Sequence, residues 1–186
     1  MAEKKSDKEK AKDKKVKELL SQLTSKDESV QVTAVKSLKV HGNESVIEPL
    51  IQVLNVTTSD KLNAEIVDLL NTIKSTKVPP EIVRCLNNQD YKGTHQVLLA
   101  SIWNSGLDYR QYMGDIANAT VQGDFMYAME CLTILENLEG KLDENEIMDA
   151  LLVFKSYLVE NKEDDATKTN LLQEIVILLQ QMNDTV

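Results

Sequence analysis

Histidine, arginine, glycine, proline and aromatic residues are all scarce in this chain of 186 residues. It has two His, two Arg, six Gly and three Pro, and aromatic side chains make up 4% of it. Strand-rich domains usually need more turn residues and more aromatic or β-branched runs, so this composition favours helices. A chain of this length can bury a sufficient apolar core without disulfides or metals.

Residues that commonly build catalytic or metal sites are few and scattered. His41 and His95 lie far apart in the sequence, and Cys85 and Cys131 have no close spacing. A zinc site needs four clustered ligands, and the motifs of phosphate loops, serine nucleophile elbows and EF-hands are all missing from the sequence. We therefore predict no catalytic residue, metal or cofactor, and we expect both cysteines to be reduced core residues.

Long apolar segments are missing as well. The densest apolar stretch, residues 171–179, is interrupted by Gln173 and Glu174 and is too short to span a bilayer. The first residues lack the apolar core of a secretory signal. These features predict a cytoplasmic protein that does not bind a membrane.

The net charge of −9 is unevenly distributed along the chain. Residues 1–18 carry eight Lys and five acidic residues, a balance of +3, whereas the rest carries 13 basic and 25 acidic side chains, a balance of −12. Such an acidic body repels a phosphate backbone, so we expect no nucleic-acid binding. Residues 1–12 alternate in charge and offer no apolar stripe, which predicts a charged, flexible N-terminal tail.

Apolar residues recur at helical spacing through most of the remaining sequence. Leu62, Ile66, Leu69 and Leu70, for example, form one stripe along a helix with 3.6 residues per turn. Gly and Pro lie between such segments, where they can end one helix or begin the next. The pattern predicts ten helices, at residues 13–24, 27–41, 45–55, 60–74, 80–88, 91–104, 109–119, 124–138, 143–160 and 165–183.

Short links and an internal similarity indicate how these helices are arranged. Links of a few residues force consecutive helices to lie antiparallel. Residues 49–55 resemble residues 80–87, and self-similarity at a period of about 30 residues is typical of solenoids. One amphipathic hairpin cannot hide its apolar face unless it stacks on a neighbour. The sequence therefore predicts an all-α, right-handed superhelix of four to five helix hairpins, which forms a single domain over residues 13–186.

Residues 27–55 resemble a HEAT repeat of the armadillo-like helical class. The resemblance is weaker over residues 60–88, and beyond residue 90 only the helix rhythm continues. Gln31 stands where the family often has Arg, which puts in doubt the polar ladder that such Arg residues form between repeats. If the resemblance holds, the second helix of each hairpin lines a concave face and the first helix a convex face. The positions that carry it are Asp27, Val30, Ala34, Leu38, Gly42, Pro49, Leu50 and Leu54.

One segment, residues 103–112, concentrates residues that are rare elsewhere in the chain. It holds the only Trp, two of the five Tyr and one of the two Arg. Aromatic residues and Arg often anchor protein interfaces. Alternatively, Trp103, Leu107 and Tyr112 close the core at a hairpin turn, with Arg110 paired to a nearby acid. Our candidate partner-binding residues are Trp103, Tyr109, Arg110, Tyr112 and, on another helix, Arg84.

These features together predict a non-enzymatic scaffold or adaptor that binds a partner protein through its concave face. The acidic body favours a basic or mixed-charge segment as the ligand. The resemblance to HEAT-like proteins leaves two alternatives: a nucleic-acid-binding module or DNA glycosylase, and a bilin-lyase-type enzyme or enzyme helper that would use Cys85. The C-terminal helix, 165–183, is apolar on more than one face, so it is either a buried cap or a self-association contact.

Overall fold

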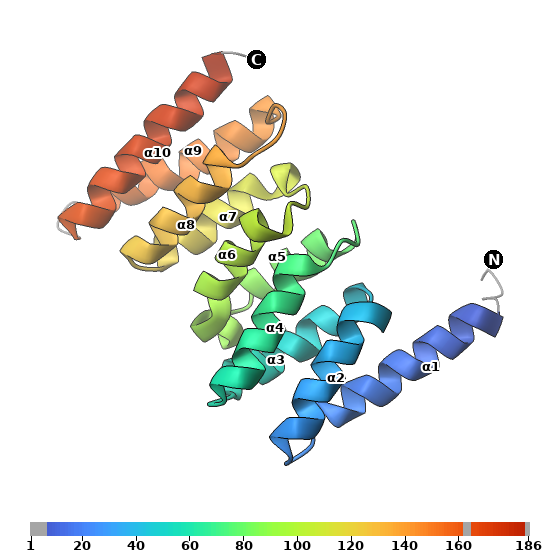
Figure 1. The fold of residues 1–186 in the computed structure, drawn as a ribbon. Coiled ribbons are helices and arrows are strands. Elements are labelled where there is room, and N and C mark those ends of the chain that lie inside the picture. The colour runs from blue at the N-terminus through green and yellow to red at the C-terminus, as the bar shows by residue number, and fades with distance from the viewer. Residues whose placement is uncertain (1–6, 162–164, 185–186) are drawn as a thin grey trace. The chain divides into compact units, whose positions relative to one another are not determined.

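In the computed structural model, residues 7–161 and 165–184 are described, and this part of the chain is all-α (Figure 1). It contains ten α-helices and no strand. Three short 3₁₀ segments, η1 (Glu44–Val46), η2 (Gln89–Thr94) and η3 (Arg110–Tyr112), lead into helices. The helices are α1 (Asp7–Gln22), α2 (Glu28–His41), α3 (Ile47–Val56), α4 (Asp60–Thr72), α5 (Val78–Leu86), α6 (His95–Ser105), α7 (Met113–Gln122), α8 (Phe125–Glu136), α9 (Glu144–Glu160) and α10 (Ala166–Asp184).

Each of the ten predicted helices has a counterpart in the structure, and the largest differences lie at their starts, while the ends agree to within three residues. The helices predicted to begin at residues 45, 91 and 109 open with η1, η2 and η3 and become α-helical a few residues later. Helix α1 already begins at Asp7, so residues 7–12 of the predicted tail are helical. Residues 1–6 lie outside the described part, and the flexibility predicted for the tail stays a prediction.

Capping side chains explain where several helices begin. Asp27, Ser59, Asp124 and Asp143 each accept a hydrogen bond from a backbone N–H in the first turn of α2, α4, α8 and α9. Such caps satisfy donors that have no partner within the helix. At the other end of a helix, Gly106 adopts a φ of 62°, a left-handed conformation that ends α6.

The chain divides into two compact units, residues 1–81 (unit 1) and 82–186 (unit 2), and each is described by itself. In unit 1, α2 packs against α1 and α4, and α3 packs against α4. The core of this unit includes Val35, Leu38, Leu50 and Ile66, which are almost completely inaccessible to solvent. The single domain that we expected over residues 13–186 stays a prediction.

Unit 2 is built as two layers of helices. Helix α8 packs between α6 and α10 in one layer, and α7 packs against α9 in the other. Contacts between α7 and α8 and between α9 and α10 join the layers around Ile116, Phe154, Leu172 and Ile175, which are fully buried. Each helix therefore contacts its neighbour in sequence or the next but one, which suggests stacked hairpins. A superhelix and its handedness stay predictions.

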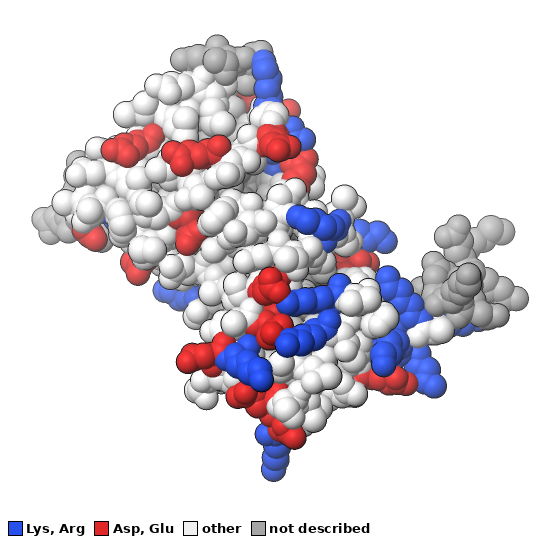
Figure 2. All heavy atoms as spheres, viewed as in Figure 1, with Lys and Arg blue, Asp and Glu red and all other residues white. Residues whose placement is uncertain are grey.

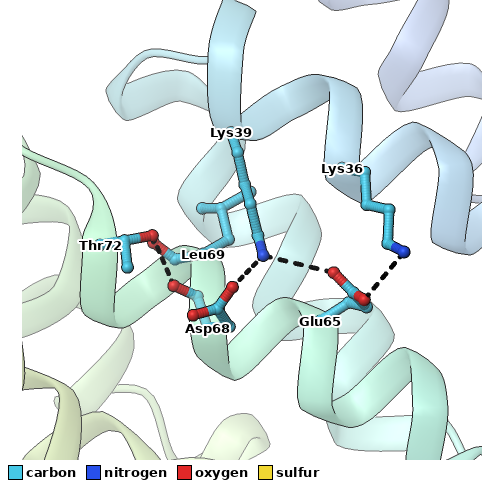
Figure 3. A network of polar contacts seen from close by, with 6 residues as sticks. All are labelled: Lys36, Lys39, Glu65, Asp68, Leu69 and Thr72. Atoms are coloured by element: carbon cyan, nitrogen blue, oxygen red, sulfur yellow. Dashed lines mark hydrogen bonds and ion pairs between the residues drawn. The ribbon is translucent and has the colours of Figure 1, made fainter.

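Helices α2 and α4 in unit 1 are joined by a network of lysines and acids (Figure 3). Lys39 Nζ contacts the Asp68 carboxylate and lies 3.3 Å from Glu65 Oε2, and Lys36 Nζ lies 3.3 Å from Glu65 Oε1. The hydrogen bond to Asp68 raises the pKa of Lys39. Lysines of α2 and acids of α4 thus link these two helices.

Gln31, the residue that departs from the HEAT pattern, has a different role. Its Nε2 donates to the backbone oxygen of Leu23 at 2.8 Å. Leu23 directly follows α1, so this hydrogen bond fixes the turn between α1 and α2. The doubt that Gln31 raises about the HEAT pattern stays open.

Most apolar side chains of α10 are buried by packing. Leu171, Leu172, Ile175 and Leu179 are buried, whereas Ile177 is 53% exposed. Self-association through this helix stays a prediction, for which Ile177 offers the main apolar surface. No helix in the described residues combines the length and apolar character needed to cross a bilayer.

Candidate protein-binding surface

Four of the five predicted contact residues meet where α6 leads into α7 in unit 2. Trp103, Tyr109 and Arg110 line one pocket of about 240 Å³. Tyr112 meets the Tyr109 ring edge-on, with ring centroids 6.5 Å apart. The fifth residue, Arg84, is exposed on α5 and does not line this pocket.

Tyr109 and Trp103 are positioned by packing between α6 and the elements beside it. Tyr109 is 1% exposed, and burial raises the pKa of its hydroxyl well above the ordinary value. Trp103 is half-buried and donates from Nε1 to Glu130 Oε2 on α8 at 2.9 Å. Tyr109 therefore closes the core, while the Trp103 ring still lines the pocket.

Arg110 is held by its near neighbour Asp108. Its Nε donates to Asp108 Oδ1 at 2.9 Å, and its Nη2 donates to Oδ2 at 2.7 Å. These hydrogen bonds from Arg110 lower the pKa of Asp108 to about 2. Arg110 Nη1 also donates to the backbone oxygen of Lys141 at 3.3 Å, next to Gly140, where a Cβ would come within 2.7 Å of Nη1. The guanidinium is thus already engaged in holding two loops together.

A second feature of unit 2 is an open groove along α7 and α9, which we call the acidic groove. It is a hollow of about 360 Å³ and adjoins a second hollow of about 450 Å³, which shares Gln111 and Glu146 but is also lined by Arg110 and Lys141. Gly114 lies where a Cβ would come within 3.3 Å of Asp149 Cβ, so its missing side chain allows the two helices to approach closely. We define the groove by Gln111, Gly114, Asp115, Asn118, Glu146, Asp149, Leu152 and Val153.

Three carboxylates line the acidic groove, and two of them are oriented by neighbours. Asp115 accepts a hydrogen bond from Asn87 Nδ2 at 2.7 Å. Glu146 accepts one from the backbone N–H of Met113 at 3.2 Å, which also caps the start of α7. Within the described ranges, no hydrogen bond or ion pair engages the Asp149 carboxylate, which is exposed. The arrangement offers negative charge and amide groups to a ligand that lies along the groove.

Sequence reasoning missed the acidic groove. Glu146 lies in the first turn of α9, but its carboxylate caps the start of α7. Residues 111, 114, 115 and 118 share one helix face by their spacing, as do 146, 149 and 153. That spacing was available in the sequence, but the pairing of the two faces depends on how α7 packs on α9.

Comparisons with protein-family models, with curated proteins and with solved structures each find no match. The likeness to HEAT repeats is therefore a resemblance carried by the residues quoted above and by the order of the helices. Function has to be argued from the surfaces of this chain.

The cysteines and histidines show no arrangement suited to catalysis. Cys131 is fully buried, and burial raises the pKa of its thiol to about 12, so it is protonated at neutral pH. Cys85 is fully buried as well. His95 is 1% exposed with Nε2 3.0 Å from the Asn88 backbone oxygen, and burial lowers its pKa. The described residues contain no cluster of three or more His, Cys, Asp or Glu that could hold a metal ion.

Proposed function

We propose that this protein is a non-enzymatic binding module, which holds a basic or mixed-charge segment of a partner protein along the acidic groove. The observation that carries this proposal is the convergence of Asp115, Glu146 and Asp149 on one open groove. Opposite charge on the ligand gives specificity and faster association, and the contribution falls with salt because the groove is exposed.

The charge of unit 2 as a whole supports the same ligand. Residues 82–186 carry 17 acidic and 7 basic side chains, a balance of −10. A strongly negative surface steers basic ligands toward it over distances of about a Debye length, roughly 8–10 Å at physiological salt. The same field repels nucleic acid, so the alternative of a nucleic-acid-binding module receives no support from this surface.

The polar and apolar residues of the groove suit an extended peptide. Gln111 is exposed and offers an amide donor and a carbonyl acceptor to a peptide backbone, whereas exposed Asn118 offers mainly its carbonyl oxygen, because its Nδ2 donates to the Gly114 backbone oxygen at 2.9 Å. Leu152 is 67% exposed at the rim and offers an apolar contact between the charges. Helices α7 and α9 are second helices of their hairpins, which the resemblance to HEAT repeats assigns to a concave, ligand-binding face.

Fluorescence anisotropy with a labelled peptide of alternating Lys and Leu tests this proposal. Asp149→Lys should weaken binding at least about tenfold, because it reverses a charge inside the groove. Glu136→Lys makes the same charge change on exposed α8 in the other layer of unit 2, and it should change affinity by less than about twofold. Equal effects of the two substitutions, or equal binding of a Glu–Leu peptide, would show that no groove-specific site exists.

A further inference from the structure

Besides the apolar residues that it packs into the core, helix α9 carries apolar residues on a side that faces away from the core. Met148, Leu152 and Val159 are 53%, 67% and 66% exposed. At 100° per residue, these three side chains and those of Glu144 and Lys155 fall within a sector of about 80° on the helix surface. We call these five residues the α9 stripe. In the layer that α9 shares with α7, the described chain provides no helix that covers it.

The two charged residues of the α9 stripe have opposite signs and stand at either side of its apolar centre. Glu144 and Lys155 are exposed, and neither forms an ion pair with any residue in the described ranges. They cannot pair with each other, since 11 residues separate them by about 16 Å along the helix axis. Along α9, Glu144 and Lys155 therefore flank the apolar pair of Met148 and Leu152, and Val159 lies about one turn beyond the base.

A pattern of this kind is complementary to itself when reversed. If two α9 helices lie antiparallel and cross near residue 150, Met148 of one copy lies opposite Leu152 of the other. In the same arrangement, Lys155 of one copy comes within one helical turn of Glu144 of the other, twice by symmetry. Two apolar contacts and two ion pairs would then form without any rearrangement of either copy.

We infer that the α9 stripe binds a second copy of this chain, as a twofold-symmetric antiparallel pair of α9 helices. The other layer of unit 2 ends differently, because the outward residues of α10 include exposed Asn170, Gln173 and Glu174. Ile177 is the one large apolar side chain exposed among the described residues of α10, whereas α9 exposes three. An interface of this size gives a weak dimer, with a Kd on the order of 0.1 mM.

Sedimentation equilibrium over a concentration series tests the inference, with circular dichroism confirming that each variant is folded. Glu144→Lys and Lys155→Glu should each weaken the dimer about tenfold, because like charges then meet across the interface. The double variant should recover the wild-type Kd to within about threefold, since the exchanged charges pair again. Met148→Lys should leave a monomer at all concentrations.

Two outcomes would overturn the inference. One is a wild-type protein that stays monomeric well above the expected Kd, and the other is a double variant that is no more dimeric than the single variants. Leu152 belongs to both the α9 stripe and the acidic groove, so the two tests are kept apart by protein concentration and by the residues that are substituted. Peptide binding is measured with micromolar protein, where the chain is monomeric, and its test substitutions lie outside the α9 stripe.

Discussion

Units 1 and 2 are built from the same kind of helix hairpin but differ in charge. Unit 1 carries 14 basic and 13 acidic side chains, whereas unit 2 carries 7 and 17. Figure 2 shows Lys and Arg gathered with acids over α1, α2 and α4, while the visible surface of α8 and α10 is largely uncharged with scattered acids. Apolar periodicity supplies most of the stacking between helices, so units with different surface charge can share the same kind of hairpin.

The polar contacts that join helices also differ between the units. In unit 1 the lysines of α2 meet the acids of α4 at partly exposed positions. In unit 2, Lys168 of α10 is only 4% exposed, and its Nζ donates to the Val121 backbone oxygen at 3.0 Å and to the Tyr157 hydroxyl at 2.5 Å. It also lies 4.2 Å from the centre of the Tyr157 ring. Substitution of a buried polar residue costs more stability than substitution of an exposed one. We therefore expect the polar contacts between helices to contribute more to stability in unit 2 than in unit 1.

The largest effect is expected from the apolar core of unit 2. Phe154 is fully buried, and Phe154→Ala should lower the free energy of unfolding by about 3–5 kcal/mol, because it leaves a cavity between α9 and its neighbours. Leu152→Ala on the same helix removes an exposed side chain and should cost less than about 0.5 kcal/mol. Urea unfolding followed by circular dichroism measures both, and similar losses would contradict the burial described for α9.

The second-largest effect is expected from substitution of the buried Lys168. Lys168→Met removes the hydrogen bonds to Val121 and Tyr157 and should cost about 2 kcal/mol, since hydrogen bonds from a charged donor are the stronger ones. Lys155→Met is the matched control on an exposed position of α9, with an expected loss below about 0.5 kcal/mol. Both are measured by urea unfolding at low protein concentration.

The contacts between the lysines of α2 and the acids of α4 in unit 1 should contribute less to stability than the Lys168 contacts in unit 2. Lys39→Met removes the contacts to Asp68 and Glu65, and it should cost less than about 1 kcal/mol because these groups are partly solvated. Repeating the measurement in about 1 M NaCl should shrink the loss further, since salt screens exposed charges. If Lys39→Met lowers the free energy of unfolding as much as Lys168→Met does, the polar contacts of the two units do not differ in their contribution to stability.

The smallest expected effect is a change in the pKa of one carboxyl group, that of Asp108. Hydrogen bonds from Arg110 lower the pKa of Asp108 to about 2, so the stability that they contribute is complete above about pH 4 and is lost as pH falls through 2. Arg110→Ala should return this pKa toward 3.8 in a carboxyl NMR titration. Asp27 in unit 1 is the control: hydrogen bonds from Ser29 lower its pKa, so Arg110→Ala should leave it unchanged.

The helices could be predicted from the sequence because their signals are local. Apolar spacing located all ten, and Gly and Pro marked breaks between them. The 3₁₀ segments were not predicted, since a three-residue turn and an α-turn leave nearly the same apolar pattern. The division after residue 81 was also hidden, because α5 runs through it without a break in periodicity.

The candidate site could be predicted only in part. Rarity of residue type was enough to single out the segment with Trp103 and Arg110, which do share a pocket. Burial of Tyr109 could not be foreseen, because it depends on packing between elements that no local pattern specifies. The acidic groove was missed for the same reason: Asp115 and Glu146 face one hollow only after α7 and α9 have packed.

An NMR titration of ¹⁵N-labelled protein with the Lys–Leu peptide tests the central claim, that unit 2 binds a basic segment along α7 and α9. We expect the largest chemical-shift changes at the amides of Gln111, Gly114, Asn118 and Asp149, with smaller changes in unit 1. Changes concentrated around the Trp103 pocket, on α6, α8 and α10, or in unit 1 would contradict the claim.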